Sequence, residues 1–401
     1  MLSNQALKEI LELVNSSDGS FIILEKDEPK LAILDFKTYQ QLVNKTQEAR
    51  QDVNSVNKNE AGYYEVTQKV LLTHAGDELS EVVVDRLVKE GFGVTVIADS
   101  SVEERIGVRV VHADFTDEAA LGDIISSDKF DSFVHLHELS GHNSSLAVPD
   151  VYFINNVEAG IRLAKILVKH GVNKIIYRSS GSLDTPYSQT KQLYERILNF
   201  YHHSFGVSSM ALRLPFVVGS KTIETGDISS LLVEDPFHAA LSAAAGKTPY
   251  LNIPHFGELT ADGTPNIEII SVADAADAIV FSIKHLNQAS GSMVYRVDGL
   301  SLSIGQLIEE VVTHTGRMVS TSRMQDPYPW SPFVEDTLPS LSKLGWVHRD
   351  SLEDLISQNW PKYAYAPPPV SLLNSPELAK PISLSDLLAG KYTPFIKPHS
   401  S

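Results

Sequence analysis

The chain has 401 residues, of which 43% are hydrophobic and 21% charged, ordinary values for a globular protein with a sizeable core. It contains no cysteine, which excludes disulfides, thiolate metal sites and a cysteine nucleophile. A formal net charge of -17 repels phosphate backbones, so nucleic acid is an unfavourable partner. The sequence shows neither an apolar run that could span a membrane nor a secretory signal, and we expect a cytoplasmic protein.

Residues 1–44 predict a small α+β module. A helical pattern is followed by a β-hairpin in FIILEKDEPKLAILDF and by a short helix at residues 37–43. This order resembles the N-terminal half of prevent-host-death antitoxins, which use the region to dimerise and to touch DNA. Because Glu25, Asp27, Glu28 and Asp35 surround the hairpin, we expect dimerisation or docking rather than DNA binding.

Residues 45–62 are polar and predict a linker. Beyond the linker, apolar strands alternate with amphipathic helices; the strands are KVLLTHA, GVTVIAD, VRVVHAD, FDSFVHLH and KIIYRSS. This alternation predicts a doubly wound parallel sheet of the Rossmann-like α/β class, covered by helices on both faces. Ligands of such sheets bind at the carboxyl ends of the strands.

The pattern loosens after residue 219, which predicts a smaller, discontinuous C-terminal lobe that continues to residue 360. Helical patterns within this part cover residues 272–286, 303–316 and 351–360. Residues 361–401 form a proline-rich tail with room for one short helix near residues 384–388.

A series of landmarks between residues 69 and 360 gives the chain a family resemblance. They are Asp99 and Asp114 after strands, the Asn155-Asn156-Val157 run, Ser180, YSQTK at residues 187–191, ALRLPFVVG, SVADAADA and SKLGWVHRDSLEDLI. In this order they resemble extended short-chain dehydrogenases/reductases of the NAD-dependent epimerase/dehydratase family, especially nucleotide-sugar enzymes of the UDP-glucose 4-epimerase type. The resemblance implies NAD or NADP as cofactor and a nucleotide sugar as substrate.

Tyr187 and Lys191 are the candidate catalytic pair. They are four residues apart on one helix face, so the ammonium can lower the pKa of the phenol and let it act as a general base. Ser180, at the end of a strand, can hydrogen-bond the same substrate hydroxyl. Only seven residues separate Ser180 from Tyr187, whereas the family has a longer loop that helps to line the pocket.

The expected cofactor site departs from the family pattern. The glycine-rich turn Thr-Gly-x-x-Gly-x-x-Gly is replaced by THAGDELS, in which Gly76 is displaced by a residue and Asp77 and Glu78 bring negative charge to the start of a helix. Asp77 is itself a good N-cap. Glu138 stands where the family has small residues beside the nicotinamide. The resemblance still implies cofactor contacts at Gly76, Asp99 (ribose), Asp114 (adenine), Asn156 and Lys191.

The substrate side is altered as well. Phe216 replaces the asparagine that the family directs at the diphosphate, and Arg323 in SRMQDP is the remaining candidate substrate contact. His135, His137 and His142 lie close together, but no carboxylate or cysteine pattern completes a ligand set, so we predict no metal site.

Two functions remain open. The retained serine, tyrosine and lysine favour an NAD(P)-dependent epimerase or dehydratase that acts on a nucleotide sugar. The altered turn favours a non-catalytic scaffold or ligand-sensing protein that acts through protein partners. In either case we expect a homo-oligomer or a protein complex formed through the N-terminal module and the tail.

Overall fold

The computed structural model describes residues 20–25, 28–34, 68–98, 102, 105, 107–115, 117–181, 185–219, 235–255, 260–327 and 338–364. Near the N-terminus, strands β1 (Ser20–Glu25) and β2 (Glu28–Leu34) pair antiparallel, as the sequence predicts. The helices expected on either side of this hairpin, the linker and the tail from residue 365 lie outside the described residues. The likeness of the module to antitoxins therefore stays a prediction, as do the domain boundaries.

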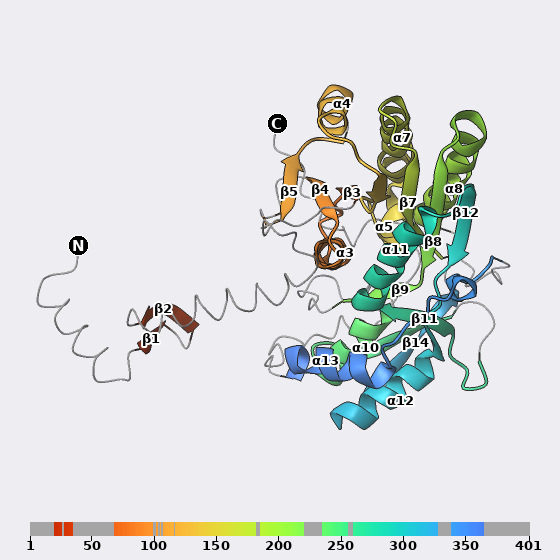
Figure 1. Cartoon of the computed structure of the whole chain (residues 1–401). Helices are drawn as coiled ribbons and strands as arrows, with labels where there is room; N and C mark the ends of the chain where they lie inside the picture. Colours follow the sequence, from red (N-terminus) through yellow and green to blue (C-terminus); the bar gives the residue numbers. More distant parts are fainter. Residues whose placement is uncertain are drawn as a thin grey trace, which may run out of the picture. The chain divides into compact units, whose positions relative to one another are not determined.

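The body of the protein is built on a seven-stranded parallel sheet, which confirms the predicted doubly wound fold (Figure 1). The strands lie in the order β12-β8-β7-β6-β3-β4-β5. Their bounds are β3 Lys69–Thr73, β4 Gly93–Ala98, β5 Val108–His112, β6 Ser132–His135, β7 Lys174–Ser180, β8 Ser208–Leu214 and β12 Ser292–Arg296. From β3 the chain moves outward to β4 and β5 and then returns to β6 on the other side. The order thus reverses between β3 and β6, the place where such sheets bind ligands.

Helices cover both faces of this sheet. Figure 1 shows α4, α7 and α8 on one side and α3 and α11 on the other. The residues of β3 alternate between the two layers, because Leu71 packs in the core under α4, α7 and α8 while Val70 and Leu72 pack in the core under α3 and α11. The bounds of these helices and of the shorter ones that follow β6 are α3 Glu78–Lys89, α4 Glu118–Ser126, α5 His142–Ala147, α6 Pro149–Tyr152, η1 Phe153–Glu158, α7 Ala159–Lys169, α8 Pro186–Phe205 and α11 Val272–Leu286.

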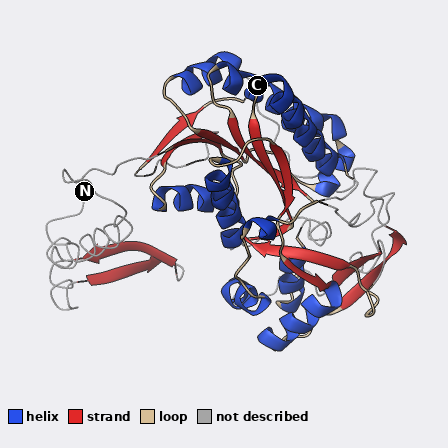
Figure 2. Ribbon diagram, turned by 45° about the vertical axis from the view of Figure 1, so that its right-hand side comes forward, coloured by secondary structure: helices blue, strands red, loops and turns tan. Residues whose placement is uncertain are grey.

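A smaller lobe carries its own core and is discontinuous in sequence, as predicted (Figure 2). The chain returns from this lobe to the main sheet for α11 and β12 and then enters the lobe again. Its elements are β9 Phe216–Val218, α10 Pro236–Ala244, β10 Leu251–His255, β11 Asn266–Ser271, β13 Leu300–Ser303, α12 Ile304–Thr315, β14 Thr321–Pro327 and α13 Leu352–Ala364. The short η3 Leu341–Leu344 precedes α13 and packs in the core of the main sheet.

Two observations complete the fold. Helix α13 continues through Pro361 to Ala364, so the first residues of the expected tail belong to a helix. Among the described helices, none has the length and apolarity that a bilayer crossing requires.

Candidate functional site

The turn between β3 and α3 is stabilised by an acidic cap. Asp77 accepts hydrogen bonds from the backbone N–H of Ser80 at 3.0 Å and from its hydroxyl at 2.7 Å, while Ser80 Oγ accepts from Ala75 N at 3.0 Å. Burial by itself raises the pKa of Asp77, but Arg178 and the bonds from Ser80 lower it to about 2. Gly76 is exposed with a positive φ of 73°, and a Cβ there would meet nothing within 4 Å. The positive φ suits a glycine in this turn, and the predicted cofactor contact at Gly76 stays a prediction.

Arg178 links this turn to the end of β6. Its guanidinium, on β7, forms a close ion pair with Asp77 and lies 3.3 Å from Glu138 Oε1. Burial disfavours the charged form, yet Glu138 and Asp77 outweigh it and raise the pKa of Arg178, which stays protonated. Arg178 is not among the site residues that the sequence pattern predicts. The available signal was an arginine directly after the apolar run IIY of the strand KIIYRSS, where a buried charge needs a partner.

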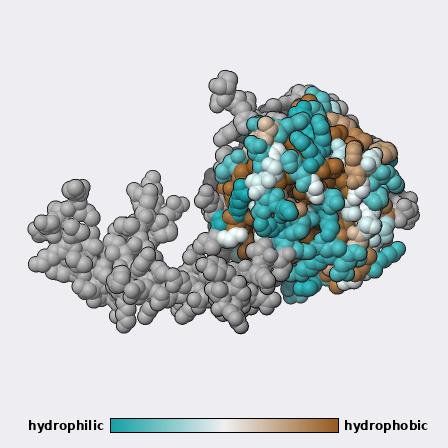
Figure 3. Space-filling model, turned by 45° about the horizontal axis from the view of Figure 1, so that its top comes forward, coloured by the Kyte–Doolittle hydropathy of each residue, from teal (hydrophilic) through white to brown (hydrophobic). Residues whose placement is uncertain are grey.

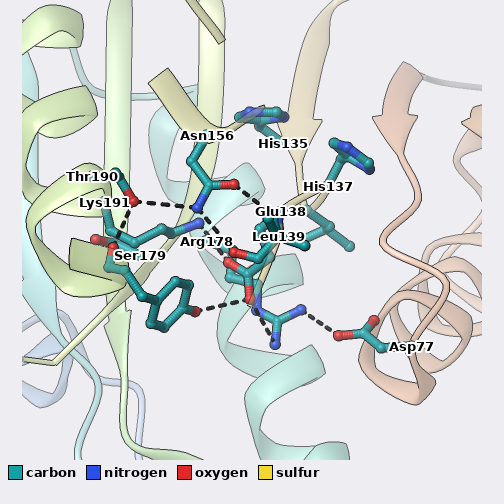
Figure 4. A network of polar contacts seen from close by, with 12 residues as sticks. Asp77, His135, His137, Glu138, Leu139, Asn156, Arg178, Ser179, Thr190 and Lys191 are labelled. Carbon is teal, nitrogen blue, oxygen red and sulfur yellow. Dashed lines mark hydrogen bonds and ion pairs between the residues drawn. The ribbon is translucent and has the colours of Figure 1, made fainter. Parts of the chain in front are cut away.

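Glu138 lies at the centre of the polar network in Figure 4. Its side chain is 2% exposed, and its carboxylate accepts from Lys191 Nζ at 2.5 Å and from Tyr187 Oη at 2.9 Å. Burial raises the pKa of Glu138, but Arg178 and Lys191 lower it below its usual value. Asp77, Glu138, Arg178 and Lys191 together form a network of two carboxylates and two cations, which we call the four-charge network.

The predicted catalytic pair lies on one face of α8, as its spacing indicates. Pro186 opens the helix and Thr185 caps it, accepting from Ser188 N at 3.3 Å. Tyr187 and Lys191 are both buried, and both side chains contact Glu138. Burial lowers the pKa of Lys191 in spite of Glu138, and its Nζ lies 4.4 Å from the centre of the Tyr177 ring.

Asn156 holds the segment that carries Glu138. Its amide accepts a hydrogen bond from Leu139 N at 2.8 Å and donates one to Leu139 O at 2.9 Å. The side chain thus satisfies both backbone groups of Leu139, as a neighbouring strand would. A third bond of 3.2 Å reaches Thr190 on α8. Asn156 is 3% exposed, and it thus fixes the distance between Glu138 and the helix of the catalytic pair.

The other predicted site residues lie around this centre or beyond it. Ser180 is the last residue of β7, beside Leu214, but the chain from 182 to 184 that separates it from Tyr187 is not described. Asp99 is also outside the described residues. Asp114 follows β5 and is exposed. Arg323 lies on β14 of the small lobe, exposed and next to Gly263.

The three histidines near β6 have different surroundings. His135 is buried and bonds Thr73 Oγ1 at 3.0 Å, and His137 stacks on Phe115 with ring centres 4.1 Å apart. His142 bonds Thr185 Oγ1 at 2.9 Å, and burial lowers its pKa to about 4. Within the described part of the chain, no group of three or more metal-ligating side chains could hold an ion.

Comparison with known proteins now identifies the family. The model of the NAD-dependent epimerase/dehydratase family matches residues 80–297, more than half of the chain, and the match begins just after the altered turn. The chain belongs to this family. It is 27% identical over 283 residues to UDP-glucose 4-epimerase of Caenorhabditis elegans, with 62% of this chain and 78% of that protein covered. It is 24% identical over 324 residues to the Bacillus subtilis (strain 168) enzyme of that name, with coverages of 73% and 95%.

Solved structures share the fold. UDP-glucose 4-epimerase from Brucella ovis in complex with NAD superimposes with a TM-score of 0.61 at 22% identity, over 74% of this chain and 99% of that one. The Bifidobacterium longum enzyme in complex with NAD+ and UDP gives a TM-score of 0.60 at 21% identity, over 73% and 98%. These likenesses confirm the Rossmann-like architecture.

Proposed function

We propose that this protein is a non-catalytic member of the NAD-dependent epimerase/dehydratase family that uses the fold as a scaffold or ligand-sensing protein. One observation carries the proposal: the buried Glu138 carboxylate binds both the hydroxyl of Tyr187 and the ammonium of Lys191. A phenol that donates to a buried carboxylate is not free to take a proton from a substrate, and an ammonium paired at 2.5 Å is not free to bind a ribose.

The residues at the helix α3 N-terminus do not fit a dinucleotide. In doubly wound folds a pyrophosphate binds there because backbone N–H groups and the helix dipole favour an anion. Here Asp77 takes the N–H of Ser80, and the carboxylate of Glu78 adds a second negative charge to the same end of the helix. An incoming pyrophosphate would meet like charges at a position already capped.

Calorimetric titration of the full chain with NAD and with NADP tests this proposal. We expect no binding of either dinucleotide at millimolar concentration and no epimerisation of UDP-glucose. Micromolar binding at about one site per chain would overturn the proposal and would direct attention to nucleotide-sugar substrates.

A second candidate function is supported by the geometry of α8 itself. Tyr187 and Lys191 lie together at the carboxyl ends of the strands, where an NAD(P)-dependent epimerase or dehydratase of a nucleotide sugar needs a base and a cation. Under this alternative Glu138 moves away, and the ammonium of Lys191 lowers the pKa of Tyr187 so that its phenolate can take the proton of a sugar hydroxyl. Ser180 orients that hydroxyl. Replacement of Tyr187 by Phe should then abolish turnover, and unchanged turnover would remove Tyr187 from the reaction.

A scaffold needs a surface that binds partners. The partner proposed for the surface described below is a second copy of this chain. The expected contacts through the N-terminal module and the tail concern residues outside the described ones. Among the described residues, large exposed apolar side chains gather on η1, α7 and α8; they are Phe153, Ile154, Ile161, Leu193, Phe200 and Phe205. Figure 3 shows hydrophobic patches between hydrophilic ones on one face of the body.

The exposed charges on these helices have both signs, such as Glu158 and Arg196, which suits self-association. Sedimentation should show a dimer that Phe200→Glu dissociates. Met318→Glu, at an exposed residue outside these helices, is the control and should leave the dimer intact. A wild-type monomer at tens of micromolar would contradict the dimer.

A further inference from the structure

The four-charge network has the composition of an anion-binding site that is already filled by the protein's own carboxylates. Two cations, Arg178 and Lys191, converge with the N-terminus of α3 at the point where the strand order reverses. These are groups that attract phosphate oxygens. We infer that Asp77 and Glu138 are built-in anions, which take the positions that a dinucleotide would otherwise require. The inference rests on the proposed non-catalytic function and adds that an anion-binding site lies beneath these two carboxylates.

The helix end gives the first line of support. Asp77 Oδ1 receives the N–H of Ser80 and Asp77 Oδ2 receives the guanidinium of Arg178. One carboxylate thus collects a backbone N–H of the first helical turn and an arginine, two kinds of donor that bind phosphate at helix N-termini.

Glu138 provides the second line of support. Its two oxygens take separate partners, because Oε2 binds Lys191 while Oε1 binds Tyr187 and faces Arg178. Asn156 binds both the N–H and the carbonyl of the adjoining Leu139, so the backbone that carries Glu138 is held in place. The charges balance, with two negative and two positive groups. The cations therefore need no external anion.

Removal of the two carboxylates should expose the hidden anion site. In the double variant Asp77→Ala/Glu138→Ala, Arg178 and the N-terminus of α3 keep their positive character without these counter-charges. Titration with inorganic pyrophosphate should then show at least tenfold tighter binding than in the wild type. The melting temperature of the double variant should rise with pyrophosphate concentration, because a ligand that binds the folded state stabilises it.

Glu195→Ala is the matched control. Glu195, on α8, is a buried carboxylate like Glu138. It accepts from Arg213 at 2.9 and 2.8 Å and from Ser179 at 2.5 Å, so its loss removes the carboxylate partner of another arginine. It has no contact with the α3 turn in the described structure, and pyrophosphate should not bind this variant more tightly. Adding Arg178→Met to the double variant should abolish the gained binding.

If the double alanine variant does not fold, Asp77→Asn/Glu138→Gln removes both charges at nearly constant shape and takes the same test. A folded variant that binds pyrophosphate no better than the Glu195→Ala control overturns the inference. So does a gain that survives Arg178→Met. Dinucleotide binding by the wild type bears instead on the proposed function, so the two failures are distinguishable.

Discussion

At the scale of single residues, one buried carboxylate determines the contacts of several other side chains. Glu138 stands at a position where the family pattern has small residues, and Tyr187, Lys191 and Arg178 are all partners of its carboxylate. A buried ion pair adds little net stability, because desolvation offsets most of the attraction. Loss of one partner, however, is costly, since it leaves the other charges buried and uncompensated.

The Glu138→Ala variant should therefore be strongly destabilised. We expect a loss of about 3–5 kcal/mol in the free energy of unfolding, measured by urea denaturation at neutral pH. Glu138→Gln keeps the acceptor for Tyr187 and should lose less. A loss below about 1 kcal/mol for the alanine variant would mean that water or another anion reaches Lys191 readily.

The pH dependence of stability should report on Asp77. Its pKa falls from 3.8 to about 2 on folding, so the folded state favours the ionised carboxylate. A group with a lowered pKa stabilises the fold above its unfolded pKa, and this contribution is lost as the pH falls from about 4 to about 2. Wild type should lose more stability than Asp77→Asn across this window in urea titrations. If the free energies of unfolding of the two proteins fall in parallel as the pH falls, protonation of Asp77 is not coupled to folding.

At the scale of elements, α8 connects the site to the core. Its first turns carry Tyr187 and Lys191, while Tyr194 and Leu198 pack in the core with α4 and α7. Tyr194 also donates to the carbonyl of Gly160 on α7 at 3.0 Å. A Cβ at Gly160 would lie 2.7 Å from the Tyr194 ring, so the close approach of the two helices requires glycine.

Gly160→Ala should push α8 away from α7 and cost about 1–3 kcal/mol, because the ring is fully buried and has no room to yield. Gly122→Ala is the matched control. Gly122 lies within α4, and an added Cβ meets nothing nearer than 4.0 Å, so alanine should stabilise the helix by up to about 1 kcal/mol. The melting temperatures of the two variants should therefore shift in opposite directions from that of the wild type. Equal shifts would contradict the packing argument.

At the scale of the whole molecule, the architecture follows from periodicity while the site does not. Apolar strands separated by amphipathic helices predict the parallel sheet, and the spacing of Tyr187 and Lys191 predicts their common face. The four-charge network joins segments as distant as Asp77 and Arg178, and no local pattern specifies which buried charge meets which. Glu138 could be recognised as a departure from the family, but its partners depend on side-chain packing. Arg178 gave only the weaker signal of a charge directly after an apolar run.

The net charge of the whole chain leads to a last prediction. Fifty acidic residues against 33 basic ones give a net charge of -17, and the excess acidic side chains repel one another when the chain is compact. Exposed ion pairs such as Arg162 with Glu158 offset little of this repulsion, because pairs of that kind contribute about 0–1 kcal/mol each. Salt shortens the screening length from about 30 Å at 0.01 M to about 8 Å at 0.15 M, whereas the buried network is screened much less.

We therefore expect the midpoint of thermal unfolding to rise between these two salt concentrations, with sodium chloride and with choline chloride alike. The rise should persist in Glu138→Ala, since the buried network does not cause it. A fall in the midpoint would show that surface ion pairs outweigh the repulsion among the acidic residues.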